Sequence, residues 1–209
     1  TDAAFEHILT VLHPDMTEIE VALELEFFMR KMGSEGIAFD TIAVSGTMSA
    51  RPHGEPRPVK LEKGFFTMDF GARVDGYCSD MTRTVVLGRA DEDMKHVYNT
   101  VLHAQTAAIE SLHVGMKCAD ADRIARDIIN AAGYEGKFGH GLGHGVGLEI
   151  HEEPRVSPNA ETVLQPNMVI TIEPGLYLPG RGGCRTEDTV LVCEDGGLRL
   201  TKTPHHIVI

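Results

Sequence analysis

The chain has 209 residues, of which 42% are hydrophobic, and carries a formal net charge of −12. This acidic balance argues against nucleic acid or an anionic membrane surface as the main partner, and no run of about 18 apolar residues predicts a membrane span. Its four cysteines form no Cys-x-x-Cys pair, which suits reduced thiols, so we expect a cytoplasmic protein.

The first part of the sequence predicts two helices. Residues 3–13 have an amphipathic pattern that Pro14 interrupts. Thr17-Glu18-Ile19-Glu20 has the pattern of a capping box and predicts a second helix that ends at Gly33. Because the chain opens almost inside a helix, we expect either a fragment of a longer protein or a naturally short one.

The remaining elements repeat the order of helices followed by a β-hairpin. Prolines keep the loop at 45–54 extended and non-helical. We predict an α+β fold, with helices on one face of a largely antiparallel sheet. The expected strands are 40–44, 65–70, 77–87, 168–173, 183–193 and a short one at the C-terminus, and the expected further helices are 91–113 and 120–132.

Residues 139–153 read Gly-His-Gly-Leu-Gly-His-Gly-Val-Gly-Leu-Glu-Ile-His-Glu-Glu and contain His140, His144 and His151. Each glycine costs a helix roughly 1 kcal/mol relative to alanine, so we expect a loop here. The histidines are therefore not two ligands on one helix face, and no HExxH zinc motif is present. Such a segment is expected to gain its order from something that it binds or encloses.

Four carboxylates, Asp69, Asp80, Glu173 and Glu187, occur in segments that otherwise read as hydrophobic strands. Any one of them could point into solvent at a strand end. Together in one place, however, four negative charges would be strongly destabilising. Two divalent cations would balance them, with a neutral imidazole as a fifth ligand. Such a carboxylate-rich set suits Mn²⁺, with Co²⁺, Zn²⁺ and Fe²⁺ as alternatives.

These segments resemble the "pita-bread" metallopeptidases, which include aminopeptidase P, prolidase and methionine aminopeptidase. The resemblance extends from about residue 17 to the C-terminus, and it implies one catalytic domain over 1–209 with two pseudo-symmetric halves. Helices would pack on a curved, largely antiparallel sheet. The matching motifs are Arg-Pro-His53-Gly, Met-Asp69-Phe-Gly, Ser-Asp80-Met-Thr-Arg-Thr, the stretch from His144 to His151, Thr-Ile-Glu173-Pro-Gly-Leu-Tyr and Arg-Thr-Glu187-Asp.

The resemblance also implies a role for each metal-ligating position. Asp69 would chelate one ion, and Asp80 and Glu187 would bridge both ions. His144 and Glu173 would complete the shell of the other ion.

Further roles follow for the remaining histidines. His53 and His151 would contact the substrate or stabilise the tetrahedral intermediate, although both could equally be packing histidines. Glu173 would shuttle a proton to the leaving proline nitrogen, and His140 would be a second candidate for proton relay.

Arg185, two residues before Glu187, is similar to the arginine of the proline-specific branch, but it could also be an ion-pair partner on a strand surface. That branch implies hydrolysis of the bond before proline in short peptides, by a water that bridges two metal ions, and it implies homodimer formation. Xaa-Pro aminopeptidase and Xaa-Pro dipeptidase stay open as alternatives. So do a methionine aminopeptidase, a creatinase-type enzyme and a non-catalytic peptide-binding module.

Overall fold

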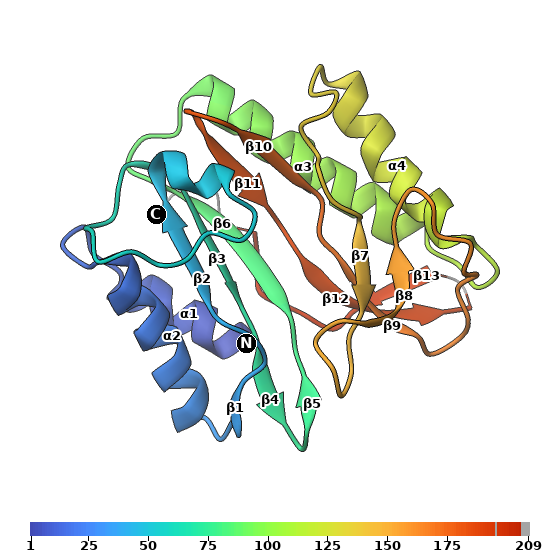
Figure 1. Ribbon diagram of the computed structural model, residues 1–209, viewed down its shortest axis with the longest axis horizontal. Helices are drawn as coiled ribbons and strands as arrows, with labels where there is room; N and C mark the ends of the chain where they lie inside the picture. The colour runs from blue at the N-terminus through green and yellow to red at the C-terminus, as the bar shows by residue number, and fades with distance from the viewer. Residues whose placement is uncertain (195, 206–209) are drawn as a thin grey trace.

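The computed structural model describes residues 1–194 and 196–205, and the chain folds there into helices and antiparallel sheets (Figure 1). Thr17 caps the second helix with the expected box, because its hydroxyl accepts from Glu20 N and the Glu20 carboxylate accepts from Thr17 N. The helices are α1 (Asp2–Val11), α2 (Glu18–Lys31), α3 (Glu92–Ser111), α4 (Cys118–Ala131) and a 3-10 helix, η1 (Gly46–Ala50).

The strands lie in several small sheets, and every strand pair within the described residues is antiparallel. The two larger sheets have the strand orders β2-β3-β6 and β13-β12-β9-β7-β8. The strands are β1 (Gly36–Ile37), β2 (Ile42–Ser45), β3 (Gly64–Phe70), β4 (Ala72–Val74), β5 (Tyr77–Cys78), β6 (Met81–Leu87), β7 (Gly143–Gly145), β8 (Glu152–Val156), β9 (Val169–Ile172), β10 (Gly175–Leu178), β11 (Gly182–Arg185), β12 (Asp188–Cys193) and β13 (Gly196–Arg199).

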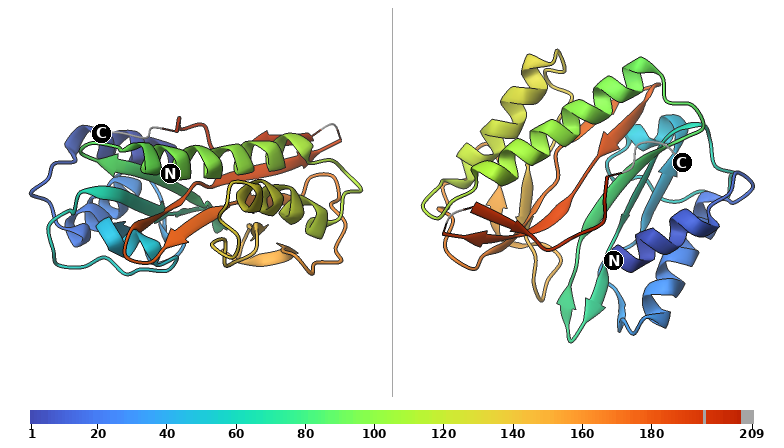
Figure 2. Two further views of the ribbon diagram at one scale, coloured as in Figure 1. Left: turned by 90° about the horizontal axis from the view of Figure 1, so that it is seen from above. Right: turned by 180° about the vertical axis from the view of Figure 1, so that it is seen from behind.

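Each half of the molecule has its own helix pair and its own hydrophobic core. In the first half, Phe66, Met68 and Phe70 of β3 pack against α1 and α2. In the second half, Ile170 and Ile172 of β9 pack against α3 and α4. Seen from behind, the helices lie on the outer side of the sheets (Figure 2). The α+β prediction is confirmed. Within the described residues, no helix has the length and apolar character needed to cross a bilayer.

Alternation along β3 positions the opposite face for chemistry. Because successive strand residues point to opposite sides, Thr67 and Asp69 face away from the helices that hold Phe66 and Met68. Thr67 contacts Thr84 on β6 through their hydroxyl groups at 3.0 Å, and Asp69 reaches Arg185 on β11. This face of the sheet therefore meets the second half of the molecule.

Two predicted strands are each interrupted. Residues 77–87 divide into β5 and β6, with Ser79 and Asp80 between them, and β11 and β12 are separated at Thr186 and Glu187. The break at Glu187 lies where the chain passes from the β10–β11 hairpin into the five-stranded sheet. The prediction that all four carboxylates lie in strands is wrong for three of them, since only Asp69 is inside one.

Three local predictions also need correction. Residues 46–50 form η1, although the loop was expected to be extended, because the prolines that constrain it begin only at Pro52. The glycine-histidine segment contains β7, so it is partly a strand. The last strand lies at 196–199, and residues 206–209 fall outside the described part of the chain.

Candidate active site

One cavity of about 410 Å³ brings all the candidate residues together. It lies between the two halves, so the ends of strands from different sheets supply its walls. His53 follows η1, His140 precedes β7, and His151 lies between β7 and β8. The candidates that line it are His53, Asp69, Asp80, His140, His144, His151, Glu173, Arg185 and Glu187.

Three buried side chains in this cavity form a cluster with the geometry of a cation site. The nearest ligand atoms of Asp80, His144 and Glu187 all lie within 4.8 Å of one another. His144 Nε2 is 3.3 Å from Glu173 Oε1 and 3.6 Å from Asp80 Oδ2. Asp69 Oδ1 is buried and has no hydrogen-bond partner among the described residues. The donor set thus leaves a buried carboxylate oxygen available for a ligand.

The contacts of His144 direct a lone pair toward the carboxylates. Its Nδ1 lies 3.0 Å from the carbonyl oxygen of Gly145, which can only accept, so Nδ1 carries the proton. Nε2 then presents its lone pair to the oxygens of Glu173 and Asp80, where a cation is needed to make the contact favourable. A backbone carbonyl that fixes the tautomer in this way is usual for metal-binding histidines.

Burial and mutual repulsion shift the pKa values of the carboxylates in the cavity. Burial, followed by the charges of neighbouring carboxylates, raises the pKa of Asp80 and of Glu187 well above the usual range. Burial also raises the pKa of Asp69, against the opposing charge of Arg185. Burial opposes ionisation of Glu173 as well, but the neighbouring His144, His140 and Arg185 leave its pKa lowered. Carboxylates arranged in this way fit divalent cations, whose charge would keep them ionised.

Arg185 connects the first half of the molecule to the second. Its Nη2 donates to Asp69 Oδ2 at 2.6 Å, its Nη1 donates to Tyr177 Oη at 2.8 Å, and its Nε donates to Thr82 Oγ1 at 3.1 Å. Only 3% of Arg185 is exposed, so the alternative of a strand-surface ion pair is wrong. Burial opposes the charge on Arg185, yet neighbouring groups such as Asp69 raise its pKa well above the usual range.

His140 already has a protein partner at each ring nitrogen. Nδ1 lies 2.8 Å from the carbonyl oxygen of Gly141, and Nε2 lies 2.7 Å from Tyr177 Oη. Since the tyrosine oxygen accepts from Arg185, its own proton can be donated to His140. Burial lowers the pKa of His140, which favours the neutral imidazole. His140 is therefore placed to support the wall of the cavity.

His53 and His151 are exposed at the cavity, whereas His140 is half-buried and His144 is buried. The rings of His151 and His144 have centroids 4.4 Å apart and meet edge to face. Burial and the neighbouring His144 lower the pKa of His151. Both side chains are accessible to a molecule that enters the cavity.

The sequence analysis missed several residues that support or line the site. Thr82 donates to Glu187 Oε2 at 2.6 Å, and Thr171 donates to Glu173 Oε1 at 3.3 Å. Tyr177 ends the Glu-Pro-Gly-Leu-Tyr motif, so only its place in that motif could have indicated it. Other lining residues that drew no attention are Phe39, Ile42, Ile150, Arg155 and Ser157.

The glycines around His144 are required by close contact between strands. A Cβ atom on Gly143 would collide with the backbone of Thr171 on β9, and one on Gly145 with the backbone of Glu153 on β8. At Gly139, by contrast, a Cβ would meet nothing within 4 Å. The glycines thus let β7 lie tightly between β8 and β9 and hold His144 in place.

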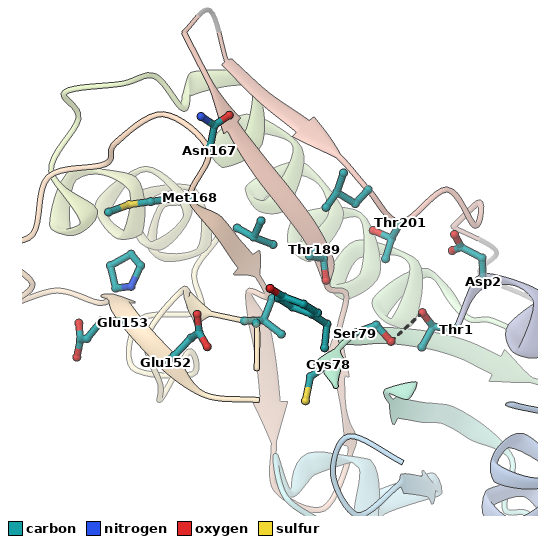
Figure 3. A pocket seen from close by; sticks show the side chains of 16 residues that line it. Thr1, Asp2, Cys78, Ser79, Glu152, Glu153, Asn167, Met168, Thr189 and Thr201 are labelled. Atoms are coloured by element: carbon teal, nitrogen blue, oxygen red, sulfur yellow. Dashed lines mark hydrogen bonds between the residues drawn. The ribbon is translucent and has the colours of Figure 1, made fainter. Parts of the chain in front are cut away.

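A second cavity, of about 480 Å³, contains none of the candidate residues. Its acidic side chains do not converge, since Glu152 and Glu153 lie on one side and Asp2 on the other (Figure 3). Across the described residues, the cluster of Asp80, His144 and Glu187 is the one group of this kind that could hold a metal ion. The candidate residues and the candidate metal cluster therefore both lie in the first cavity.

Known proteins share this sequence and architecture. The chain is 50% identical over 192 residues to a Xaa-Pro dipeptidase of Pyrococcus furiosus, covering 91% of this chain and 55% of the relative. It is also 44% identical over 209 residues to an uncharacterized peptidase of Bacillus subtilis, covering 100% of this chain and 59% of the relative. The chain thus spans somewhat more than half the length of these relatives.

Solved structures agree with the sequence relatives. A Xaa-Pro dipeptidase from Bacillus anthracis superposes with a TM-score of 0.97 at 48% identity, covering 100% of this chain and 59% of the other. An X-Pro aminopeptidase from Thermotoga maritima gives a TM-score of 0.96 at 42% identity, covering 99% and 59%. These likenesses confirm the pita-bread fold, and residues 1–194 match metallopeptidase family M24. The chain therefore belongs to metallopeptidase family M24.

Proposed function

We propose that residues 1–209 form the catalytic domain of a peptidase that requires two divalent metal ions and hydrolyses the bond before proline in short peptides. The convergence of Asp80, His144 and Glu187 in one buried cluster carries this proposal. The names of the relatives at 42–50% identity, which include Xaa-Pro dipeptidase and X-Pro aminopeptidase, support the choice of bond.

The proposed metal ligands are Asp69, Asp80, His144, Glu173 and Glu187. Asp80 and Glu187 would be shared between the ions, Asp69 would serve one ion, and His144 with Glu173 would serve the other. Mn²⁺ is the preferred ion, and Co²⁺, Zn²⁺ or Fe²⁺ would suit the same oxygen-rich donor set. Bound there, the cations would supply positive charge that activates water for attack and polarises the carbonyl of the substrate.

The remaining side chains would orient the substrate and move protons. His53 and His151 are exposed at the cavity and can donate hydrogen bonds to the oxygen on which negative charge develops. Glu173 lies within reach of the same space and can carry a proton toward the leaving nitrogen. Arg185 and His140 would act through the side chains that they hold, Asp69 and Tyr177.

The cavity wall suits a short peptide with a proline ring. Phe39, Ile42 and Ile150 contribute apolar surface, and Arg155 contributes a positive charge at the same opening. A guanidinium group can pair with the free carboxylate of a dipeptide. This arrangement favours a dipeptidase, although an aminopeptidase would use the same metal site.

The four cysteines are free thiols, which supports a cytoplasmic location as part of the proposal. Homodimer formation also belongs to it, and light scattering at several protein concentrations would test that part directly.

The test is to load the protein with Mn²⁺ and to measure its hydrolysis of three substrates, which are Gly-Pro, Gly-Pro-Yaa and a Met-Gly-Ser peptide. We expect cleavage of Gly-Pro, and a larger loss on Gly-Pro than on Gly-Pro-Yaa when Arg155→Ala is assayed. Preference for Gly-Pro-Yaa would indicate an aminopeptidase. Cleavage of Met-Gly-Ser alone would indicate the methionine-specific branch, and bound metal with no cleavage would indicate a peptide-binding module.

A further inference from the structure

Arg83 and Asp188 form a buried ion pair directly behind the candidate metal ligands. Arg83 Nη2 lies 2.7 Å from Asp188 Oδ1, and the two side chains are 2% and 1% exposed. They are 105 residues apart in sequence, on β6 and β12. Neither lines the active-site cavity, so their role cannot be direct contact with substrate.

The guanidinium of Arg83 reaches beyond its ion-pair partner. Nη1 donates to the carbonyl oxygen of Glu187 at 2.6 Å and to that of Thr82 at 3.0 Å. Nη2 also donates to the carbonyl oxygen of Thr203 at 2.9 Å. The planar fork therefore holds the backbone of a candidate ligand and not only the charge of Asp188.

Other hydrogen bonds also join the segment around β6 to the segment around β12. Glu187 N donates to Thr82 O at 3.1 Å, and Thr189 Oγ1 donates to Asp80 O at 2.8 Å. Since β6 belongs to the three-stranded sheet and β12 to the five-stranded sheet, no β-ladder fixes their register (Figure 1). With the hydrogen bond from Thr82 Oγ1 to Glu187 Oε2, these contacts help to join the segments that carry Asp80 and Glu187.

Residues 201–203 cover the side of the Arg83–Asp188 pair that faces away from the metal ligands. Thr201 Oγ1 donates to Asp188 Oδ1 at 2.7 Å, and the Asp2 carboxylate accepts from the backbone N of Lys202 and of Thr203 at 3.1 Å. Thr201 and Asp2 border the second cavity, where Thr189 also lies (Figure 3). The ion pair is thus enclosed between that cavity and the metal ligands.

We propose that Arg83 and Asp188 are positioning residues that set the distance between Asp80 and Glu187, and so the affinity of the site for divalent cations. Asp80 precedes Arg83 by three residues and Glu187 adjoins Asp188, so a shift of the pair moves both carboxylates. The inference rests on the proposed function, because it assumes that both carboxylates bind metal. Partners that orient metal ligands typically change metal affinity by about 10- to 100-fold when they are removed.

The test compares Asp188→Asn and Arg83→Lys with Glu18→Gln. Glu18 is a matched control, because it is fully buried and paired with Arg57 at 2.7 Å but lies outside the active-site cavity. Mn²⁺ affinity is measured by titration calorimetry, and Tm is measured on the metal-free protein. We expect Asp188→Asn and Arg83→Lys to weaken Mn²⁺ binding about 10- to 100-fold, and Glu18→Gln to lower Tm while binding Mn²⁺ normally.

Arg83→Lys keeps a positive charge beside Asp188 but cannot form the fork, so it serves if Asp188→Asn does not fold. The visible absorption of bound Co²⁺ gives a second readout, because it responds to ligand geometry. This spectrum should change in Arg83→Lys and stay unchanged in the control Glu18→Gln. The inference is overturned if Arg83→Lys binds Mn²⁺ as tightly as the natural chain does. It is also overturned if Glu18→Gln loses as much Mn²⁺ affinity as Arg83→Lys. A natural chain that binds no Mn²⁺ overturns the proposed function itself.

Discussion

Arg185 Nη2 donates a 2.6 Å hydrogen bond to Asp69 Oδ2, which joins the end of β11 to the end of β3. Both side chains are buried, at 3% and 12% exposure. Besides its proposed role toward metal, Asp69 thus has a protein cation that partly compensates its charge. The pair links the two halves of the molecule at the edge of the cavity.

Removing that cation should destabilise the metal-free protein strongly. Arg185→Met leaves the Asp69 carboxylate buried without compensation, which typically costs about 3–5 kcal/mol. Urea unfolding without metal measures the loss. Arg181→Met is the control, because Arg181 pairs with Asp93 at 2.7 Å on the surface, with 61% and 77% exposure. Exposed pairs contribute about 0–1 kcal/mol, so losses of similar size in the two variants would contradict the account.

Glu187→Gln should have opposite effects on the metal-free and metal-loaded protein. Without metal, removing one of the crowded negative charges relieves repulsion from Asp80, so the free energy of unfolding should increase. With Mn²⁺, the variant should gain little further stability, because a proposed ligand has been lost. Calorimetric Tm values detect both effects, since 1 kcal/mol shifts Tm by about 2–4 °C at this size. A less stable metal-free variant would refute the claim of crowded charge.

Gly143→Ala should disturb the site through strand packing. Its Cβ would collide with the Thr171 backbone, and overpacking of this kind typically costs about 1–3 kcal/mol. His144 follows directly, so we also expect weaker Mn²⁺ binding. Gly139→Ala is the matched control, because a Cβ there meets nothing within 4 Å, and we expect it to be neutral or stabilising by about 0.4–1 kcal/mol. Thermal unfolding of both variants checks the difference, and equal stability would contradict it.

Glu18 makes a pH-dependent contribution away from the site. Burial opposes its ionisation, but hydrogen bonds from Arg57 and Ser45 lower its pKa. A lowered carboxyl pKa means that the stabilisation is present above the unfolded value, about 4.3, and is lost as the pH falls through the folded value. Glu18→Gln should cost about 1–3 kcal/mol at pH 7.

The measurement is urea unfolding of both proteins between pH 7 and pH 3. The difference in unfolding free energy between the natural chain and Glu18→Gln should shrink with acidification. A difference that stays constant across this range would show that the charge of Glu18 does not stabilise the fold.

Local patterns in the sequence predict the helices well, and they single out residues that the structure places around one cavity. Long-range pairing explains what these patterns miss. The capping box at Thr17 and Glu20 predicts where α2 begins, because capping depends on neighbours in sequence. The break before β12 carries no glycine or proline, so Glu187 reads as mid-strand. Glu187 leaves the strand because the chain there changes from one sheet to another.

Buried charges were missed for a related reason. Arg83 and Asp188 read as ordinary strand residues, because a charged residue is normally exposed and its partner here lies 105 residues away. Asp122, likewise, accepts from Leu142 N, which is 20 residues away, and this contact ties α4 to the glycine-histidine segment. Only the folded structure brings such partners together.

The central claim is that the cluster around Asp80, His144 and Glu187 holds the metal on which peptide hydrolysis depends. Elemental analysis of the purified natural chain and of Asp80→Ala and Glu187→Ala, combined with Mn²⁺-dependent cleavage of Gly-Pro, tests it most directly. We expect two equivalents of metal and cleavage in the natural chain, and loss of both in each variant. Undiminished metal content and Gly-Pro cleavage in either variant would contradict the account.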